Sequence, residues 1–142
     1  MTIDKFAGDY RWLSNFWPAE VEYEGVKYPT TEHAFQAAKT ENLGQRRHVR
    51  KAASPAEAKK LGRQVTLRPG WDSMKDEVML DLNRQKFRDP GLRAKLLATG
   101  DRPLIEGNHW NDTYWGVCRG KGKNRLGQIL MKIRHEIREA TP

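Results

Sequence analysis

The sequence predicts an α+β fold, a single mostly helical domain with short antiparallel strands. Its 142 residues are enough for one domain with a hydrophobic core and too few for two of ordinary size. Apolar residues recur at helical spacing in several segments that carry helix-start and helix-stop residues. Runs that suit strands are short, and they do not alternate with helices as a parallel sheet requires. We therefore expect one domain over residues 1–142.

The first half of the chain is expected to form a hairpin followed by helices. The stretch "VEYEGVKYP" alternates apolar and polar residues around a Glu-Gly turn at 24–25, which predicts a small β-hairpin. Thr30 is the expected N-cap of a helix in "TTEHAFQAAKT". In "SPAEAKKLG", Ser54 and Glu57 form a capping box, and Gly62 is the expected end of that helix.

The second half is expected to be mainly helical. Asp72 is the expected cap of a long helix, and Asp89 with the following proline ends it and starts another that stops at Gly100. The short apolar runs "PLIEGN" and "YWGVC" are predicted strands or buried turns. Asn124 is the expected cap of a final helix. Its inward stripe is predicted to consist of Leu126, Ile129, Leu130, Ile133 and Ile137.

Positive charge is concentrated in two segments of a chain whose formal net charge is +8. The segment "RGKGKNR" contains four basic residues and no acid. Between residues 45 and 70 the only acid is Glu57, against eight basic residues: Arg46, Arg47, Arg50, Lys51, Lys59, Lys60, Arg63 and Arg68. Such segments favour an anionic ligand, whether nucleic acid, a nucleotide or a phosphorylated metabolite.

Several classes of protein are disfavoured by what the sequence lacks. The longest apolar runs are a few residues, and the N-terminus has no apolar signal core, so we expect a cytoplasmic protein without membrane contact. The single cysteine, Cys118, is predicted to be a small buried residue. The four histidines have no ligand spacing, and "HEIRE" does not match HExxH, so we expect neither a metal nor a cofactor.

One edge of the helix predicted after Thr30 carries Glu32, Gln36 and Lys39. Spacing alone favours an ordinary solvent-exposed face with polar pairs. The alternative is the edge of an active site, where Glu32 serves as a general acid or base. A lysine removed from water would there become a usable amine nucleophile.

Two aromatic-rich stretches offer stacking surfaces. "IEGNHWNDTYWGVC" contains Trp110 and Trp115, which suit a base or a sugar, and Asn108 and Asp112, which suit ribose hydroxyls. The alternative is a tryptophan-rich small core that holds a loop. "YRWLSNFWPAE" either buries its aromatic residues or presents Asn15 and the following phenylalanine to a nucleotide.

Glycines and basic residues precede the final helix in "GVCRGKGKNRLG". Backbone N–H groups and the helix dipole at such a position suit a phosphate, here at Lys121 to Asn124. The stretch is not a P-loop, because the spacing from Gly116 is one residue short and the Ser or Thr is missing. An exposed basic loop is the alternative.

Taken together, these stretches resemble the NADAR family, also called YbiA-like. The matching pattern begins with "GDYRWLSNF" and "YPTTEHAFQAAK", and continues through Gly62-Arg63, Trp71 and Lys86-Phe87. It closes with Glu106, the segment 108–116, and "GKNRLG" leading into "ILMKIR". The match covers nearly the whole chain in order.

The resemblance implies a hydrolase acting on N-glycosyl bonds. The implied reaction cleaves the bond between ribose C1′ and a base amino group. The favoured substrate is ADP-ribosylated guanine in nucleic acid. The alternatives are phosphorylated ribosylamino-pyrimidine intermediates of riboflavin synthesis, and a module that binds ADP-ribose or nucleic acid without turnover. An ADP-ribosyltransferase toxin is a further partner in keeping with the resemblance, and the residues themselves do not indicate it.

The resemblance and the stretches described above together give the expected site residues. The expected catalytic residues are Glu32, Lys39 and Asp112. The expected substrate-binding residues are Ser14, Asn15, Phe16, Gln36, Trp71, Asn108, Trp110, Trp115, Gly116, Lys121, Gly122 and Asn124. The ligand is expected to be ADP-ribose or a ribose phosphate. Some YbiA-like members carry Trp-Gly-Asp where this chain has Trp-Gly-Val at 115–117, so Asp112 is the candidate second acid and the riboflavin-type substrate is less favoured.

Overall fold

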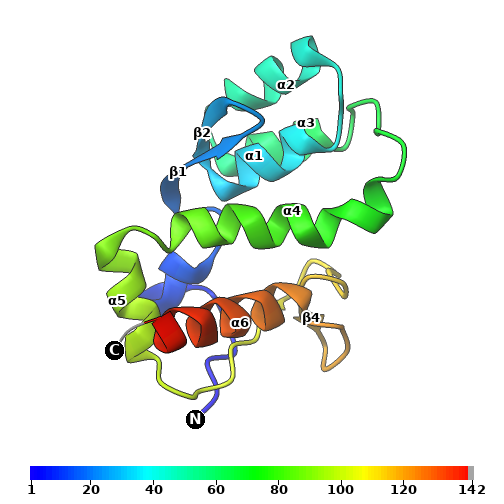
Figure 1. Ribbon diagram of the computed structural model, residues 1–142. Coiled ribbons are helices and arrows are strands. Elements are labelled where there is room, and N and C mark those ends of the chain that lie inside the picture. The colour runs from blue at the N-terminus through cyan, green and yellow to red at the C-terminus, as the bar shows by residue number, and fades with distance from the viewer. Residues whose placement is uncertain (141–142) are drawn as a thin grey trace. The chain divides into compact units, whose positions relative to one another are not determined.

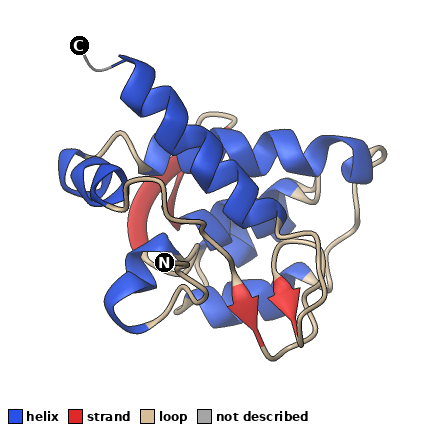
Figure 2. Ribbon diagram, turned by 90° about the horizontal axis from the view of Figure 1, so that it is seen from below, coloured by secondary structure: helices blue, strands red, loops and turns tan. Residues whose placement is uncertain are grey.

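The computed structural model describes residues 1–140, so the last two residues of the predicted domain lie outside it. The chain forms two compact units. Unit 1 combines Met1–Ser14 with the chain from Phe87 onward, and unit 2 is Asn15–Lys86. Figure 2 shows two separate pairs of strands among helices, which fits the predicted α+β class.

Unit 2 surrounds one short helix with the other elements of the unit. Its elements are β1 (Pro18–Tyr23), β2 (Val26–Thr30), α1 (Thr31–Ala38), α2 (Leu43–Arg50), α3 (Pro55–Gly62) and α4 (Trp71–Lys86). Helix α1 contacts both strands and all three other helices (Figure 1). As a result, all eight of its residues are buried, polar ones included.

Local sequence signals explain the start of unit 2. Strands β1 and β2 pair antiparallel, with Val21 opposite Tyr28. Glu24 and Gly25 both have positive φ, 47° and 84°, as a two-residue type I′ hairpin turn requires. The hydroxyl of Ser54 accepts a hydrogen bond from the Glu57 N–H, which confirms the predicted cap of α3.

Unit 1 is built on the long C-terminal helix. Its elements are the 3-10 helix η1 (Gly8–Leu13), α5 (Pro90–Ala98), β3 (Gly107–Asn108), β4 (Val117–Cys118) and α6 (Arg125–Ala140). The predicted stripe of α6 is buried at Leu126, Ile129, Leu130 and Ile133, and Ile137 is partly exposed. Asp89 accepts a hydrogen bond from the Leu92 N–H, as expected of the cap of α5. Cys118 is buried, as predicted.

Four details of the prediction are wrong or missing. Strands β3 and β4 pair parallel, whereas antiparallel pairing was expected. Asp72 lies inside the first turn of α4, which begins at Trp71. Asn124 precedes α6, but its side chain bonds to Glu106 N and Leu104 O instead of capping the helix. Helix α2 was not predicted, although Asn42 caps it.

No helix within residues 1–140 has the length and apolar character needed to cross a bilayer.

Helix α4 ends in a buried lysine. Lys86 is 2% exposed, and burial lowers its pKa from 10.5 to about 7. The same lysine in the unfolded chain keeps its ordinary pKa. Between about pH 7 and 10.5 the unfolded state therefore binds more protons than the folded state, so stability rises with pH across this window.

Replacing Lys86 with methionine should flatten this rise. We expect the free energy of unfolding of the wild type to gain up to about 1 kcal/mol per pH unit relative to Lys86→Met. Urea unfolding of both proteins between pH 7 and 10 measures the difference in slope. Lys132→Met is the matched control, because Lys132 is exposed on α6. Parallel curves for wild type and Lys86→Met would contradict the prediction.

Candidate functional site

Four hydrogen bonds fix the beginning of α1. The His33 N–H donates to Thr30 Oγ1 (3.1 Å), which confirms Thr30 as the N-cap. The His33 ring bonds to the Thr30 hydroxyl (2.8 Å) through Nδ1 and to the Ala52 carbonyl (3.0 Å) through Nε2. Since a carbonyl can only accept, Nε2 carries the proton and Nδ1 accepts from the hydroxyl. The Glu32 N–H donates to the Asn15 carbonyl (3.1 Å). The main chain around Glu32 is therefore bonded both to Thr30 and to Asn15.

Glu32 and Gln36 form a buried pair one turn apart on α1. Glu32 is 7% exposed and Gln36 is 5% exposed. The Gln36 Nε2 donates to Glu32 Oε2 at 2.5 Å, whereas the other amide atom, Oε1, is buried and makes no hydrogen bond. The interpretation of this edge as a solvent-exposed face is therefore wrong. A buried carboxylate fixed by an amide is suited to proton transfer at a defined position.

Gly62 of α3 provides the space in which the Gln36 amide lies. A Cβ at position 62 would overlap Gln36 Oε1 and lie 2.7 Å from its Cδ and 2.9 Å from its Cβ. Any larger residue must displace the Gln36 side chain. The glycine predicted as the end of a helix thus also determines how Gln36 holds Glu32.

Lys39 follows α1 and is partly buried. Burial is the main cause that lowers its pKa from 10.5. The Glu32 carboxylate raises the pKa, and Arg63, Lys59 and Lys75 lower it further. Desolvation together with neighbouring cations is the environment that makes a lysine amine nucleophilic.

The other predicted residues of unit 2 divide into packed and exposed side chains. Trp71 is 5% exposed and lies against Phe35, with ring centroids 5.2 Å apart, so it forms part of the core around α1. Asn15 is also buried, with its Nδ2 3.4 Å from the sulfur of Met79. Phe16, which was expected to be presented to a nucleotide, is 39% exposed.

In unit 1, Asn108 and Asp112 are engaged in holding their own loop. Asn108 Oδ1 accepts from the Asp112 N–H (3.1 Å), and Asn108 Nδ2 donates to the Asp112 carbonyl (2.9 Å). Asp112 Oδ1 accepts from the N–H groups of Tyr114 (3.1 Å) and Trp115 (2.9 Å). These bonds support a structural role for both side chains, and a catalytic role for Asp112 stays a prediction.

The proposed use of backbone N–H groups before α6 is contradicted by the hydrogen bonds. The N–H groups of residues 123–126 donate to the carbonyls of residues 113, 116, 114 and 115, in that order, at 2.8–3.3 Å. They are therefore not available to a phosphate. Because the Lys121 N–H also donates to the Cys118 carbonyl (3.0 Å), a phosphate at Lys121 to Asn124 would be bound mainly by side chains.

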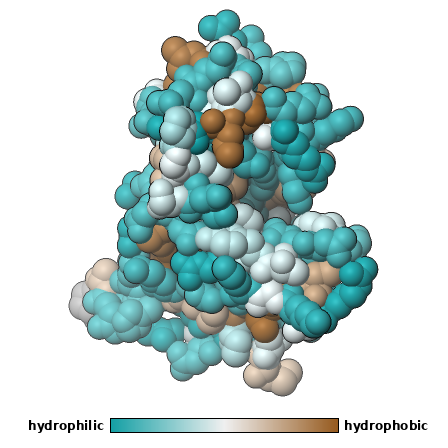
Figure 3. All heavy atoms as spheres, turned by 90° about the vertical axis from the view of Figure 1, so that its right-hand side faces the viewer, coloured by the Kyte–Doolittle hydropathy of each residue, from teal (hydrophilic) through white to brown (hydrophobic). Residues whose placement is uncertain are grey.

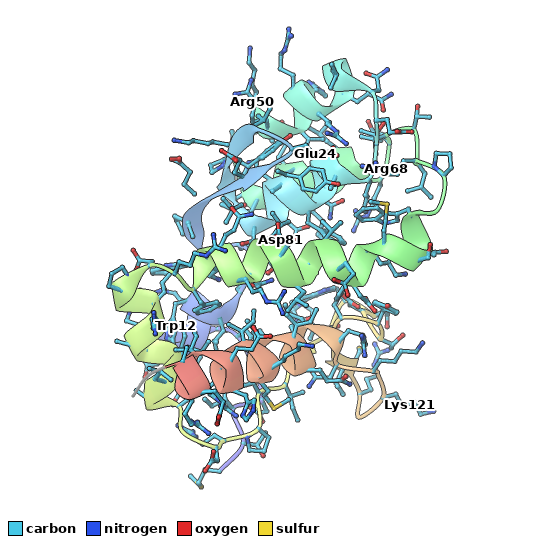
Figure 4. The ribbon with its side chains drawn as sticks, viewed as in Figure 1. Trp12, Glu24, Arg50, Arg68, Asp81 and Lys121 are labelled. Atoms are coloured by element: carbon cyan, nitrogen blue, oxygen red, sulfur yellow. The ribbon has the colours of Figure 1, made fainter. Side chains whose placement is uncertain are left out.

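The remaining predicted residues of unit 1 shape this turn or lie on the surface. A Cβ on Gly116 would overlap the Glu106 carbonyl, and one on Gly122 would overlap the Gly116 carbonyl, so both glycines allow close backbone packing. Lys121 is exposed at the outer end of the hairpin turn that follows β4 (Figure 4). Trp110 is 50% exposed and offers an indole face. Three other predicted residues, Ser14, Trp115 and Asn124, are partly buried.

The residues that surround Glu32, Gln36 and Lys39, here called the α1 edge, could not be predicted from the sequence. The contact of Gly62 with Gln36 and the cations around Lys39 join positions 20 or more residues apart. The motif "GR" at 62–63 was the available signal, and it gave no indication of the partner.

The comparisons with known proteins identify the family. The NADAR domain model matches residues 4–138. The chain belongs to the NADAR family. The N-glycosidase YbiA of Escherichia coli (strain K12) is 44% identical over 135 residues, which cover 91% of this chain and 82% of that protein.

The structure and names of other NADAR relatives agree with this assignment. The NMR structure of the E. coli protein YbiA matches with a TM-score of 0.85 and 39% identity, covering 99% of this chain and 85% of that one. This confirms the α+β fold. A protein of Vibrio vulnificus (strain YJ016) named for riboflavin biosynthesis is 37% identical over 94% of this chain and 37% of its own length. The relatives named N-glycosidase are hydrolases acting on N-glycosyl bonds, which supports the prediction of an enzyme.

Proposed function

We propose that this protein hydrolyses the N-glycosidic bond between ribose C1′ and a base amino group, and that its substrate is ADP-ribosylated guanine in nucleic acid. The observation that carries the proposal is the buried edge of α1. It combines a carboxylate oriented by Gln36 with a lysine whose pKa burial lowers. Breaking a ribosyl C–N bond needs a proton for the leaving amine and a nucleophile for C1′, and this edge supplies both.

In the proposed first stage, Glu32 donates a proton to the ring oxygen of the ribose. The C1′–O bond breaks, and the lone pair of the base nitrogen forms a C1′=N double bond. The neutral amine of Lys39 then adds to C1′ and gives up a proton to the Glu32 carboxylate. Glu32 returns that proton to the base nitrogen, the C1′–N bond to the base breaks with its electron pair on the nitrogen, and the base leaves with its amino group restored.

In the second stage, water releases the sugar from Lys39. The Glu32 carboxylate takes a proton from water as its oxygen adds to C1′ of the lysine imine. Glu32 then gives this proton to Nζ, the C1′–Nζ bond breaks with its electron pair on the nitrogen, and the C1′ hydroxyl passes its proton to the Glu32 carboxylate. The lysine amine and the Glu32 acid are thereby recovered, and the aldehyde closes to the free ribose. The net change is addition of one water across the original bond.

The choice of an ADP-ribosylated base in nucleic acid rests on charge and on one missing carboxylate. Several cations of α2 and α3 are exposed, among them Arg47, Lys51, Lys60 and Arg63. A metabolite with a single phosphate needs no such surface, whereas a polyanion does. Val117 stands where some family members carry an aspartate. An ADP-ribosyltransferase that modifies guanine is the class of enzyme that must supply this substrate.

The second candidate substrate is a phosphorylated ribosylamino-pyrimidine. The name of the Vibrio relative favours it. The same bond type is broken, so the two substrates differ in what surrounds the ribose and not in the chemistry proposed for Glu32 and Lys39.

Incubation with an oligonucleotide that carries one ADP-ribosylated guanine tests the proposal. We expect mass spectrometry to show free ADP-ribose and an oligonucleotide with unmodified guanine. Tight binding without either product after long incubation would identify a binding module instead, and would overturn the proposed activity.

Replacing Gly62 with alanine should lower turnover while unit 2 stays folded. The new Cβ displaces the Gln36 amide, and Glu32 loses the partner that orients it. Misplacement of a catalytic group by about 1 Å can lower the reaction rate about 100-fold. We therefore expect kcat to fall about 10- to 100-fold. Steady-state kinetics on the same oligonucleotide measure the effect.

Two further variants separate positioning from general damage. Gly91→Ala on α5 is the matched control, since a Cβ there meets only Asp89 Oδ2 at 3.3 Å. In a Gln36→Ala background the amide that clashes with residue 62 is gone and only the Cβ contact at 2.9 Å remains, so Gly62→Ala should have little additional effect on kcat. If the two substitutions instead lower kcat additively, Gly62 does not act through Gln36.

A further inference from the structure

A pocket lies between α2 and α3, within unit 2. Its volume is about 400 Å³. Val49, Leu61 and Val65 line it with apolar surface, and His48 and Gln64 line it with polar side chains. The volume falls in the range of small-ligand sites, and the mixture of apolar walls with a few polar groups is typical of them.

Two of the four polar side chains that line the pocket are available to a ligand. His48 and Gln64 are exposed, and neither side chain hydrogen-bonds to another residue within the described part of the chain. Gln45, by contrast, is engaged. Its Oε1 accepts from Thr66 N at 2.8 Å, and its Nε2 donates to Thr66 Oγ1 at 3.2 Å, which ties the segment after α3 to α2. The pocket thus has a fixed wall and free polar groups at its mouth.

Two exposed lysines are close in sequence to residues that line the pocket. Lys51 follows α2 three residues after His48, and Lys60 directly precedes Leu61. Both are exposed, and neither forms an ion pair within residues 1–140. Arg46 and Arg68 differ, because the Glu24 carboxylate lies 2.7 Å from the Arg46 guanidinium and 3.9 Å from that of Arg68. Glu24 and Arg68 are labelled in Figure 4. The lysines therefore keep their charge available for an anion.

We propose that this pocket binds an unpaired nucleobase of a single-stranded nucleic acid and that Lys51 and Lys60 contact its flanking phosphates. A base has an apolar face for Leu61 and Val65, which are partly exposed, and polar edges for His48 and Gln64. The charge of the surface fits a polyanion, with eight cations and one acid between residues 45 and 70. The inference rests on the proposed function only for the choice of nucleic acid.

Helix α3 connects this pocket with the Glu32 edge. Leu61 lines the pocket, and the next residue, Gly62, contacts Gln36. Consecutive residues lie about 100° apart around a helix, so the two sites lie on neighbouring faces of α3, and its diameter of about 10 Å sets an upper scale of about three nucleotides at 3.4 Å per step. An enzyme that acts on a base must take it out of a duplex or use a single strand. One strand can therefore place a neighbouring base in this pocket while its modified guanine reaches Glu32.

Exposed leucines raise the alternative of a protein partner. Leu43 is 74% exposed and Leu67 is 58% exposed. The face of the molecule drawn in Figure 3 is mostly hydrophilic, with hydrophobic residues only in small patches. The density of free cations around the pocket favours nucleic acid over an apolar protein surface.

Binding of an unmodified, fluorescently labelled 12-nucleotide DNA strand tests the contribution of the lysines. The double variant Lys51→Gln/Lys60→Gln should bind the strand about tenfold more weakly at 0.1 M salt. The slope of log affinity against log salt concentration should become shallower by about 1.4, which is about 0.7 per lost phosphate contact. Lys5→Gln/Lys132→Gln removes the same charge from exposed positions of unit 1 and should change affinity less than about twofold. An equal loss of DNA affinity in the two double variants would overturn the proposal.

An abasic strand of the same length tests the contribution of the base. Wild type should prefer the normal strand by at least about fivefold, since stacking of a base contributes about 1 kcal/mol or more. Gln64→Trp fills the mouth of the pocket, keeps both lysines and should abolish this preference. Equal binding of both strands by wild type would overturn the proposal and leave Leu43 and Leu67 as a protein-docking surface. Because these strands carry no ADP-ribose, the assay succeeds or fails independently of hydrolysis.

Discussion

Glu32→Gln should abolish most of the hydrolysis of ADP-ribosylated guanine while the fold is preserved. Glutamine has nearly the same shape and can still hydrogen-bond to Gln36 after its amide rotates, but it can neither donate nor accept the proton that the reaction moves. General acid–base catalysis typically contributes about 100- to 10,000-fold, so we expect kcat to fall within that range. The release of ADP-ribose over time measures it.

A glutamate on the surface of the same unit provides the control. Glu77 is exposed on α4, and Glu77→Gln removes the same charge without touching the α1 edge. Its kcat should stay within about twofold of wild type. Thermal unfolding of both variants checks that the fold is intact. A Glu32→Gln enzyme with at least half of the wild-type rate would exclude Glu32 as the proton-transfer group.

Lys39→Arg should have a kcat at least about 1,000-fold below that of the wild type, although arginine keeps the positive charge. The proposed role requires a neutral amine, and a guanidinium does not lose its proton in proteins. Sodium borohydride added during turnover should trap the sugar on Lys39 of the wild type, seen as a mass increase of the intact protein, and trap nothing on the variant. An active Lys39→Arg enzyme would show that Lys39 acts by its charge alone and that water attacks C1′ directly.

The pH dependence follows from the environment of Lys39. Burial lowers its pKa below 10.5, so the neutral amine is present at lower pH than in an ordinary lysine. The rate should therefore rise with pH through this lowered pKa, as a pH–rate profile of ADP-ribose release would show. Replacing Lys59 and Arg63 with glutamine removes two neighbours that lower the pKa, so the rise should move to higher pH.

Most of the local structure could be predicted because its causes are local. The Glu-Gly turn at 24–25, the Thr30 cap and the cap of α3 each depend on a few neighbouring residues, and the structure has all three. Helix α2 was missed because a single buried residue, Val49, carries its apolar face. The prediction that backbone N–H groups before α6 bind a phosphate was wrong. These N–H groups bond to carbonyls of a preceding loop, and residue spacing does not reveal such bonds.

The α1 edge shows the limit of spacing most clearly. Glu32, Gln36 and Lys39 have the spacing of a wet helix face, and only the packing of α2, α3, α4 and the hairpin around α1 buries them. Burial changes their chemistry, because it fixes the carboxylate against Gln36 and lowers the pKa of the lysine. The family resemblance singled out these residues, whereas the burial and the pKa shift on which their proposed role rests come from these long-range contacts.

A competition between the two substrate classes tests the central claim most directly. An equimolar mixture of an oligonucleotide with ADP-ribosylated guanine and a phosphorylated ribosylamino-pyrimidine would be incubated with the wild-type protein, and both products followed by mass in the same samples. We predict that free ADP-ribose appears first and that the pyrimidine substrate persists. Preferential cleavage of the pyrimidine substrate, with the ADP-ribosylated strand left intact, would contradict the account.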